Sequence, residues 1–177
     1  MVAALALGIG LDDARAQGPR VELGIDSGVE HQTAHGDHFT LVGFPMATSS
    51  ALPGIRIGFA SGPVMQFELG LGFTLAAYGD EETTTEVRSG ASLLFFAAPP
   101  AESVRPYVRA GVQLYSLSGD CGSDGPRFGF GGGLGLEARL TGPAWFRFEG
   151  SYANFPEKDG HPAVGALAGR FGLSLIL

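Results

Sequence analysis

The histidines of the chain are its best candidates for metal binding, because imidazole nitrogens are frequent zinc ligands. His31, His35 and His38 lie in one polar segment with Asp37, and His161 lies in a second polar segment. The four imidazoles would form a surface metal site if folding brought the two segments together. Their spacing is irregular, and the i, i+4 spacing of His31 and His35 aligns ligands only on a helix. Solvated loop side chains are the simpler interpretation, so we expect no metal site and no cofactor.

The serines are the next candidates, as nucleophiles. Ser92, Ser151 and Ser174 lie in segments with the alternating pattern of β-strands, and no histidine lies in those segments. Serine nucleophiles require an adjacent base, a role that histidine most often fills. Because no such pair can be assigned, the sequence predicts a protein that is not an enzyme, with these serines as small filling residues.

Arginines and carboxylates form the largest set of residues with chemical potential, because they recur at every second position of apolar segments. Alternate side chains of a strand share one face, so these charges would gather on one face of a sheet. Buried charges must pair, and the planar guanidinium group pairs with carboxylates while keeping its charge. We expect an interior ionic cluster; the alternative is a conduction path or proton relay. The residues are Glu22, Asp26, Arg56, Glu68, Arg88, Arg109, Glu137, Arg139, Arg147, Glu149 and Arg170.

The segments that carry these charges alternate between apolar and polar residues, the pattern of strands with two unlike faces. In residues 127–140, for example, Phe128, Phe130 and Leu134 oppose Gly129 and Gly131. Each such segment reaches the length of about nine residues that crosses a bilayer at a tilt. Eight strands are expected, near residues 20–30, 52–60, 64–77, 85–97, 105–117, 127–140, 144–155 and 164–177.

The connections between these strands alternate in length. Short turns are expected at 61–63, 98–103 and 141–143, and longer polar loops at 31–51, 78–84, 118–126 and 156–163. With eight strands, all short turns fall at one end. This asymmetry predicts an all-β fold, an eight-stranded antiparallel up-and-down transmembrane β-barrel with short periplasmic turns and longer external loops. Residues 39–47 do not fit this count, and either extend the second strand or fold over the barrel mouth.

The composition indicates which face is outside. Charged residues are 16% of the chain, against about 25% in ordinary soluble domains. Lys158 is the single lysine among 11 Lys and Arg residues, although water-exposed surfaces normally carry several. Most of the surface is therefore not in water. An inward polar face also explains many of the 29 glycines, because an eight-stranded barrel has room only for side chains. The net charge of −7 disfavours nucleic-acid binding.

The N-terminus predicts export. Residues 2–11 are apolar, and Ala14-Arg15-Ala16 is a small-x-small cleavage pattern, so residues 1–16 are expected to be a signal peptide and 17–177 a single barrel domain. A basic region does not precede the apolar stretch, which favours a start codon upstream of Met1. Cys121, the one cysteine, cannot form an internal disulfide.

The C-terminal segment 170–177 is similar to the assembly signal of outer-membrane barrels, with Arg170, Gly172, Leu175 and Leu177 at the matching positions. Leu177 departs from the aromatic residue that usually ends this signal. With the export pattern and the eight strands, the chain resembles the small eight-stranded outer-membrane β-barrel family, which includes the outer-membrane protein A, X and W types.

The resemblance implies a monomer in the outer membrane of a Gram-negative envelope, in contact with lipid and lipopolysaccharide, and assembled by the barrel-assembly machinery. It implies a structural, envelope-stabilising or surface-interaction role with a lumen filled by side chains. Two alternatives stay open: a narrow channel or transporter for small or hydrophobic solutes, with residues 39–47 as a gate, and a soluble lipocalin-like carrier.

Overall fold

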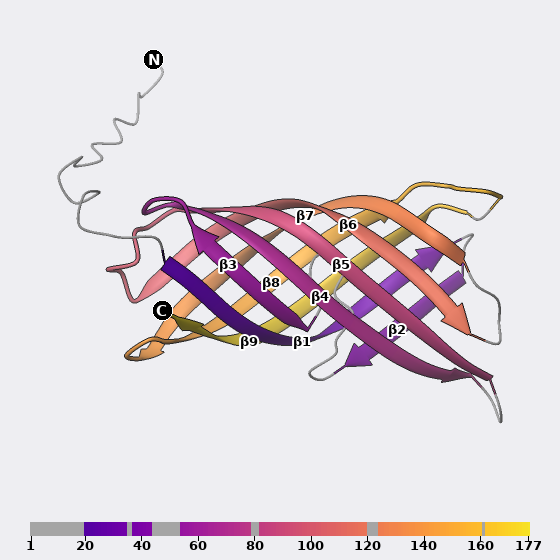
Figure 1. Cartoon of the computed structure of the whole chain (residues 1–177), viewed down its shortest axis with the longest axis horizontal. Helices are drawn as coiled ribbons and strands as arrows, with labels where there is room; N and C mark the ends of the chain where they lie inside the picture. The colour runs from indigo at the N-terminus through magenta and orange to yellow at the C-terminus, as the bar shows by residue number, and fades with distance from the viewer. Residues whose placement is uncertain (1–19, 35–36, 44–53, 79–81, 120–123, 161) are drawn as a thin grey trace, which may run out of the picture.

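The computed structural model describes residues 20–34, 37–43, 54–78, 82–119, 124–160 and 162–177, which form one antiparallel sheet (Figure 1). No helix in these ranges is long and apolar enough to cross a membrane. The strands are β1 (Arg20–Ala34), β2 (Asp37–Gly43), β3 (Ile55–Ala60), β4 (Met65–Tyr78), β5 (Glu82–Phe96), β6 (Val104–Gly119), β7 (Asp124–Thr141), β8 (Ala144–Phe155) and β9 (Val164–Ile176).

The sheet closes into a barrel because β1 pairs with β9 along almost its whole length. On its other edge, β1 pairs with β3 over Arg20 to Ile25 and with β2 over Gly28 to Ala34. β2 and β3 therefore share one position beside β1, and the barrel has eight strand positions. This arrangement confirms the expected all-β, eight-stranded antiparallel fold.

Residues 39–43, which the alternation pattern left open, belong to β2. This strand pairs with Gly28 to Ala34 of β1 and so extends the second barrel position. Of the two expected placements, extension of the second strand is therefore correct for these residues. Residues 44–47 lie outside the described residues. The sequence between β2 and β3 contains Pro45 and Pro53, which lack the amide hydrogen that a sheet ladder needs.

The three short turns lie at one end of the barrel, which we call the turn end, and the longer connections lie at the opposite, loop end (Figure 1). Strands at the turn end are separated by residues 61–64, 97–103 and 142–143, as expected. Gly62 and Gly142 occupy turns there with φ angles of +93° and +48°, which glycine tolerates. At the loop end, pairing continues further than expected, to Tyr78 and Glu82 in one hairpin.

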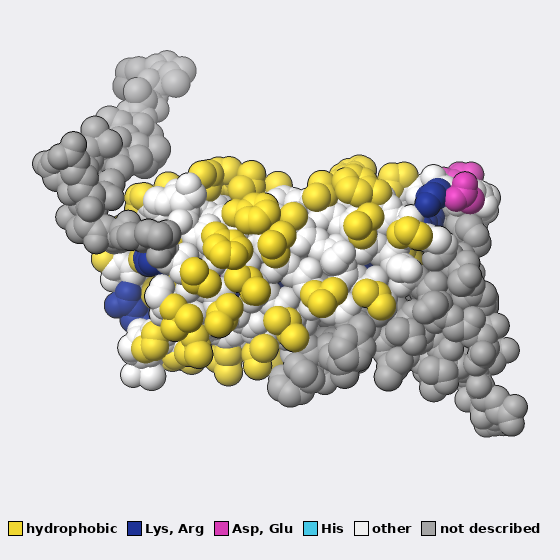
Figure 2. Space-filling model, in the orientation of Figure 1, with side chains coloured by type: hydrophobic (Ala, Val, Ile, Leu, Met, Phe, Trp, Pro, Cys, Tyr) yellow, Lys and Arg dark blue, Asp and Glu magenta, His cyan; other side chains and the backbone are white. Residues whose placement is uncertain are grey.

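The apolar faces of the strands point outward (Figure 2). Leu71, Phe128 and Leu167 are 55–61% exposed, whereas Glu68 and Arg170 are completely buried. In the view of Figure 2, charged side chains gather at the two ends of the barrel, and apolar side chains cover the flank between them. This distribution is the reverse of a soluble domain and matches a barrel with an apolar outer band.

Glycines of β7 make room inside the barrel. A Cβ added at Gly135 would collide with the ring and hydroxyl of Tyr107, and at Gly133 it would lie 2.8 Å from the carbonyl oxygen of Gly150. Outward-facing Gly150 and Gly169 have no atom within 4 Å of an added Cβ. The inward glycines are therefore required by volume, as the composition predicts.

We expect Gly135→Ala to lower the free energy of unfolding by about 2 kcal/mol, because overpacking a filled interior forces neighbouring groups to move. Gly150→Ala, which meets open space on the same sheet, is the matched control and should change stability by less than about 0.5 kcal/mol. Urea unfolding of the two refolded variants checks this. Equal losses in both would show that the contact with Tyr107 does not set the cost.

Candidate functional site

The structure places ten of the eleven expected charged residues inside the barrel. They come from β1 and from each strand from β3 to β9, and each is at most 4% exposed. The ten residues, which we call the ionic cluster, are Glu22, Asp26, Arg56, Glu68, Arg88, Arg109, Glu137, Arg147, Glu149 and Arg170.

Glu149 of β8 receives the most contacts in the cluster. Arg170 and Arg147 donate to its Oε2 at 2.8 and 3.1 Å, and Arg109 donates to its Oε1. The Tyr107 hydroxyl donates to Oε2 at 2.7 Å and accepts from Arg147 Nε at 2.6 Å. Three guanidinium groups and a phenol thus surround one desolvated carboxylate, which compensates for the loss of its water.

Glu68 of β4 links this group to the opposite wall. Arg147 Nη1 donates to Glu68 Oε2 at 2.5 Å, so Arg147 bridges the carboxylates of Glu68 and Glu149. Arg56 Nη1 lies 3.5 Å from Oε2 of Glu68, and Arg109 Nη1 lies 3.6 Å from Oε1. Side chains from β3, β4, β6 and β8 therefore meet across the lumen.

Arg56 of β3 connects the cluster to β1 and β9. Its Nε donates to Asp26 at 3.0 Å, its Nη1 donates to Glu22, and its Nη2 donates to the Ser174 hydroxyl at 2.5 Å. Asp26 also lies 3.4 Å from Arg170. The strands on both sides of the closing β1–β9 seam are thus joined by charge pairs as well as by backbone hydrogen bonds.

A separate pair lies toward the loop end. Arg88 donates to both oxygens of Glu30, at 3.0 and 2.7 Å, and Gln32 donates to the same carboxylate at 2.7 Å. The Arg88 guanidinium lies 5.1 and 5.4 Å from the ring centroids of Tyr115 and Phe155. The two-point carboxylate contact fixes the guanidinium plane against these rings.

At the turn end, Arg105 lies between two aromatic rings. Its guanidinium is 4.2 Å from the centroid of Phe96 and 4.7 Å from that of Trp145, and it donates to Glu137. Cation–π contacts of this kind are strongest where water is excluded, as it is from Arg105, which is 2% exposed.

Arg139 was expected in the cluster, and this expectation is wrong. The residue is exposed at the end of β7, where the register shifts between Arg139 and Thr141. Its guanidinium lies 4.9 Å from the Trp145 ring and donates to the carbonyl oxygen of Pro100 in a turn. The alternation of the sequence assigns a face but not a level along the barrel, and at this level the lumen has ended.

The expected cluster also omits three buried charged residues, Glu30, Arg105 and Arg127. Each continues the inward parity of its strand, near one end of that strand. Arg127 donates to the carbonyl oxygens of Pro156 and Pro162, at 3.1 and 2.5 Å. Extending the alternation to the strand ends would have found all three.

The other candidate residues form no site among the described side chains. His31 lies in β1 with its side chain on the outer face, while the side chains of His35, His38 and His161 lie outside the described residues. In the described ranges no three metal-binding side chains come together. Ser92, Ser151 and Ser174 are buried in the lumen, where no described histidine lies near them.

The central level of the lumen is closed to water. Glu68, Arg147, Glu149 and Arg170 each have 0% exposure, although they lie inside a hollow fold. The cluster therefore fills the barrel rather than lining a passage.

Comparison with known proteins agrees with this architecture. The model of the outer membrane protein beta-barrel domain family matches residues 1–171. The chain belongs to this family. The membership in an outer-membrane barrel family that the sequence predicts is thereby confirmed. No curated protein sequence matches the chain.

Solved structures of this barrel type share its fold at low sequence identity. Neisserial surface protein A superposes with a TM-score of 0.67 at 15% identity, covering 90% of this chain and 99% of that chain. Ail, the attachment invasion locus protein of Yersinia pestis, has a TM-score of 0.57 at 13% identity, covering 91% and 100%. A major outer membrane protein from Thermus thermophilus has a TM-score of 0.54 at 12% identity, covering 91% and 100%.

In this outer membrane protein beta-barrel domain, we expect Glu149→Gln to lower the free energy of unfolding by about 3–5 kcal/mol. The change leaves Arg109, Arg147 and Arg170 buried with one carboxylate fewer, and an uncompensated buried charge is costly. Denaturant unfolding in micelles measures the loss. Glu102→Gln, in an exposed turn, is the control and should stay within about 0.5 kcal/mol of the unmodified protein. A loss below about 1 kcal/mol for Glu149→Gln, on the order of an exposed pair, would contradict the burial of this network.

Proposed function

We propose that the protein is a monomeric, non-enzymatic barrel of the outer membrane with a structural, envelope-stabilising role and a lumen closed by the ionic cluster. The observation that carries the proposal is the combination of an apolar flank with a central lumen level that has no exposure to water. A structural barrel needs stable contact with lipid and no passage, and both features serve that role.

The outer face supports a position in the bilayer. Leucine, isoleucine, valine and phenylalanine side chains from β1 and from β3 to β9 are exposed along the flank of the barrel. By the usual arrangement of such barrels, the turn end faces the periplasm and the loop end faces outward. Outer-membrane lipid and lipopolysaccharide would then be its surroundings.

The C-terminal segment supports assembly by the barrel-assembly machinery, and its residues divide between two tasks. Leu175 and Leu177 are exposed on the outer face, where a machinery could bind them. Arg170 lies inside the ionic cluster, and a Cβ at Gly172 would collide with the Asp26 carboxylate. The inward half of the segment is therefore constrained by the finished barrel as well.

Neither alternative is favoured by the described residues. A channel or transporter needs a continuous path, and Glu68, Arg147 and Glu149 block the lumen at its centre. A lipocalin-like carrier needs an apolar interior and a polar exterior, whereas this barrel has the opposite arrangement.

The membrane position predicts a difference between two equally exposed leucines. Leu134 and Leu177 are both 68% exposed, but Leu134 lies midway along the outward residues of β7, and Leu177 ends the chain at the turn end. In lipid vesicles, Leu134→Arg should cost about 2–4 kcal/mol and Leu177→Arg about 0–1 kcal/mol, because the cost of arginine depends on depth. Urea unfolding in vesicles measures both. Equal and small effects would favour a barrel in water.

The closed lumen predicts that the refolded protein produces no unitary conductance steps in planar bilayers. The double variant Glu68→Ala with Arg147→Ala removes one negative and one positive side chain from the central level, and should produce small steps. Insertion is verified by the heat-dependent electrophoretic shift of both proteins. Steps of equal size in the two proteins would contradict the closed lumen.

A further inference from the structure

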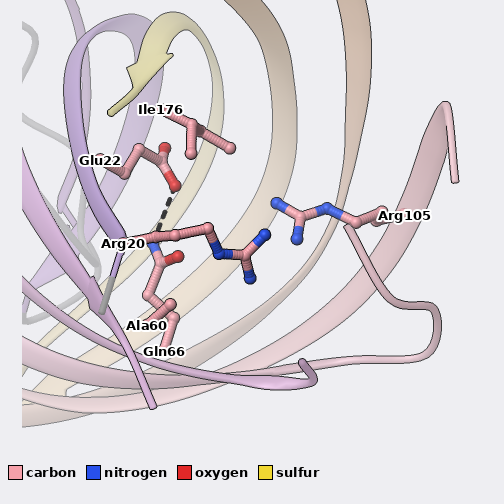
Figure 3. Close-up of a pocket in the computed structure, with 6 residues that line it drawn as sticks. All are labelled: Arg20, Glu22, Ala60, Gln66, Arg105 and Ile176. Carbon is pink, nitrogen blue, oxygen red and sulfur yellow. Dashed lines mark hydrogen bonds between the residues drawn. The ribbon is translucent and has the colours of Figure 1, made fainter. Parts of the chain in front are cut away.

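The turn end of the lumen contains a small cavity between two arginines. It has a volume of about 10 Å³ and is lined by Arg20, Glu22, Ala60, Gln66, Arg105 and Ile176. The guanidinium groups of Arg20 and Arg105 point toward each other across it (Figure 3). A cavity of this size accepts about one water-sized atom. Because two cations face the same space, the preferred occupant of that space is an anionic atom.

The carboxylates near the cavity already have hydrogen-bond donors other than Arg20. Glu22 receives hydrogen bonds from Arg56 and from Gln66, the latter at 2.9 Å, so its carboxylate is already engaged on its own side (Figure 3). Glu137 accepts one hydrogen bond from Arg105. Glu137 and Glu22 attract the Arg20 guanidinium and Arg105 repels it, and among the described residues no hydrogen bond or ion pair of Arg20 is found. Arg20 is thus attracted by two carboxylates whose hydrogen bonds go to Arg56 and Arg105, and among the described residues it has no such bond itself.

The two arginines are suited to different parts of a binding site. Arg105 is 2% exposed and held between the rings of Phe96 and Trp145, and its buried Nε has no hydrogen-bond partner among the described residues. Arg20 is the first residue of β1 and is only partly buried, so it lies at the entrance. The inner guanidinium is fixed before any ligand arrives, which lowers the entropy cost of binding.

We propose that Arg20 and Arg105 form a binding site for a phosphate-class oxyanion at the turn end of the barrel. One oxygen would occupy the cavity between the two guanidinium groups, and the rest of the ion would remain outside at the entrance. Guanidinium groups bind phosphate oxygens by short charge-assisted hydrogen bonds, which selects phosphate over chloride. The phosphate can belong to a free ion or to a lipid headgroup at the barrel rim.

The single tryptophan of the chain reports on this site, because the Trp145 ring packs on Arg105. The protein is refolded in lauryldimethylamine oxide micelles, which contain no phosphate. Inorganic phosphate then replaces chloride at constant ionic strength, while Trp145 emission and the heat of binding are recorded. We expect a saturable change in both. The absence of saturable heat and of an emission change would overturn the proposal.

Arg20→Gln is the test variant, because Arg20 has no hydrogen bond or ion pair among the described residues and is only partly buried, so its removal breaks no close charge pair. We expect phosphate to bind about tenfold more weakly or worse, the loss of one charge-assisted hydrogen bond. Arg139→Gln is the matched control, since Arg139 also lies against Trp145, at 4.9 Å, but does not line the cavity. Its phosphate affinity should equal that of the unmodified protein. An unchanged affinity in Arg20→Gln would overturn the site.

A second arm distinguishes the two phosphate sources and rests on the proposed membrane position. In vesicles of phosphatidylcholine with phosphatidylglycerol, a headgroup ligand already occupies the site, so added phosphate gives no further change. A free-ion ligand still titrates there as it does in micelles. The micelle experiment does not depend on the membrane position, so failure of the site and failure of the proposed function are distinguishable.

Discussion

The pairing of desolvated arginines with carboxylates is the constraint on which the rest of this barrel depends. Glu149 and Glu68 lie where water cannot reach them, and guanidinium groups of the ionic cluster pair with both carboxylates. Each strand must therefore place its charged side chain at the same height along the barrel axis as the oppositely charged side chains of the other strands. A slip of one residue would place Arg147 in the apolar band and Phe146 or Phe148 in the lumen. The ionic cluster and the apolar flank thus specify the same register from opposite sides of the sheet.

Volume is the second constraint, and it follows from the first. Long arginine side chains fit into a narrow barrel only where the facing position is small. A Cβ at Gly24 would collide with the Arg56 guanidinium, and a Cβ at Gly28 would lie 2.9 Å from the Cβ of Arg170. Glycine and arginine are therefore complementary parts of one packing arrangement, and neither residue type explains the interior alone.

The sequence alone predicts the faces of the strands but not the levels at which side chains meet. Period-two alternation gives the strand count and places ten charged residues on the face that lines the lumen, and the connection lengths distinguish the two ends of the barrel. Alternation contains no information on strand tilt, so it cannot show that Glu149 meets Arg109, which is 40 residues earlier in the chain. The same gap explains Arg139, which has inward parity but lies beyond the end of the lumen. The division of one barrel position between β2 and β3 is indicated only by residues 39–47, which do not fit the strand count, and by Pro45 and Pro53.

A charged interior is not the most stabilising way to fill a barrel, since apolar side chains of similar volume often replace buried ion pairs without loss. Its value lies in what it excludes. Strands with leucine and phenylalanine on both faces would have no preferred face for lipid and would pair with one another in any register. With Arg56, Glu68 or Arg147 on one face, a strand has only one face that can meet lipid, and only a closed barrel satisfies the other. The charges therefore contribute less to the free energy of unfolding than to the selection of a single register and a single lipid-facing side.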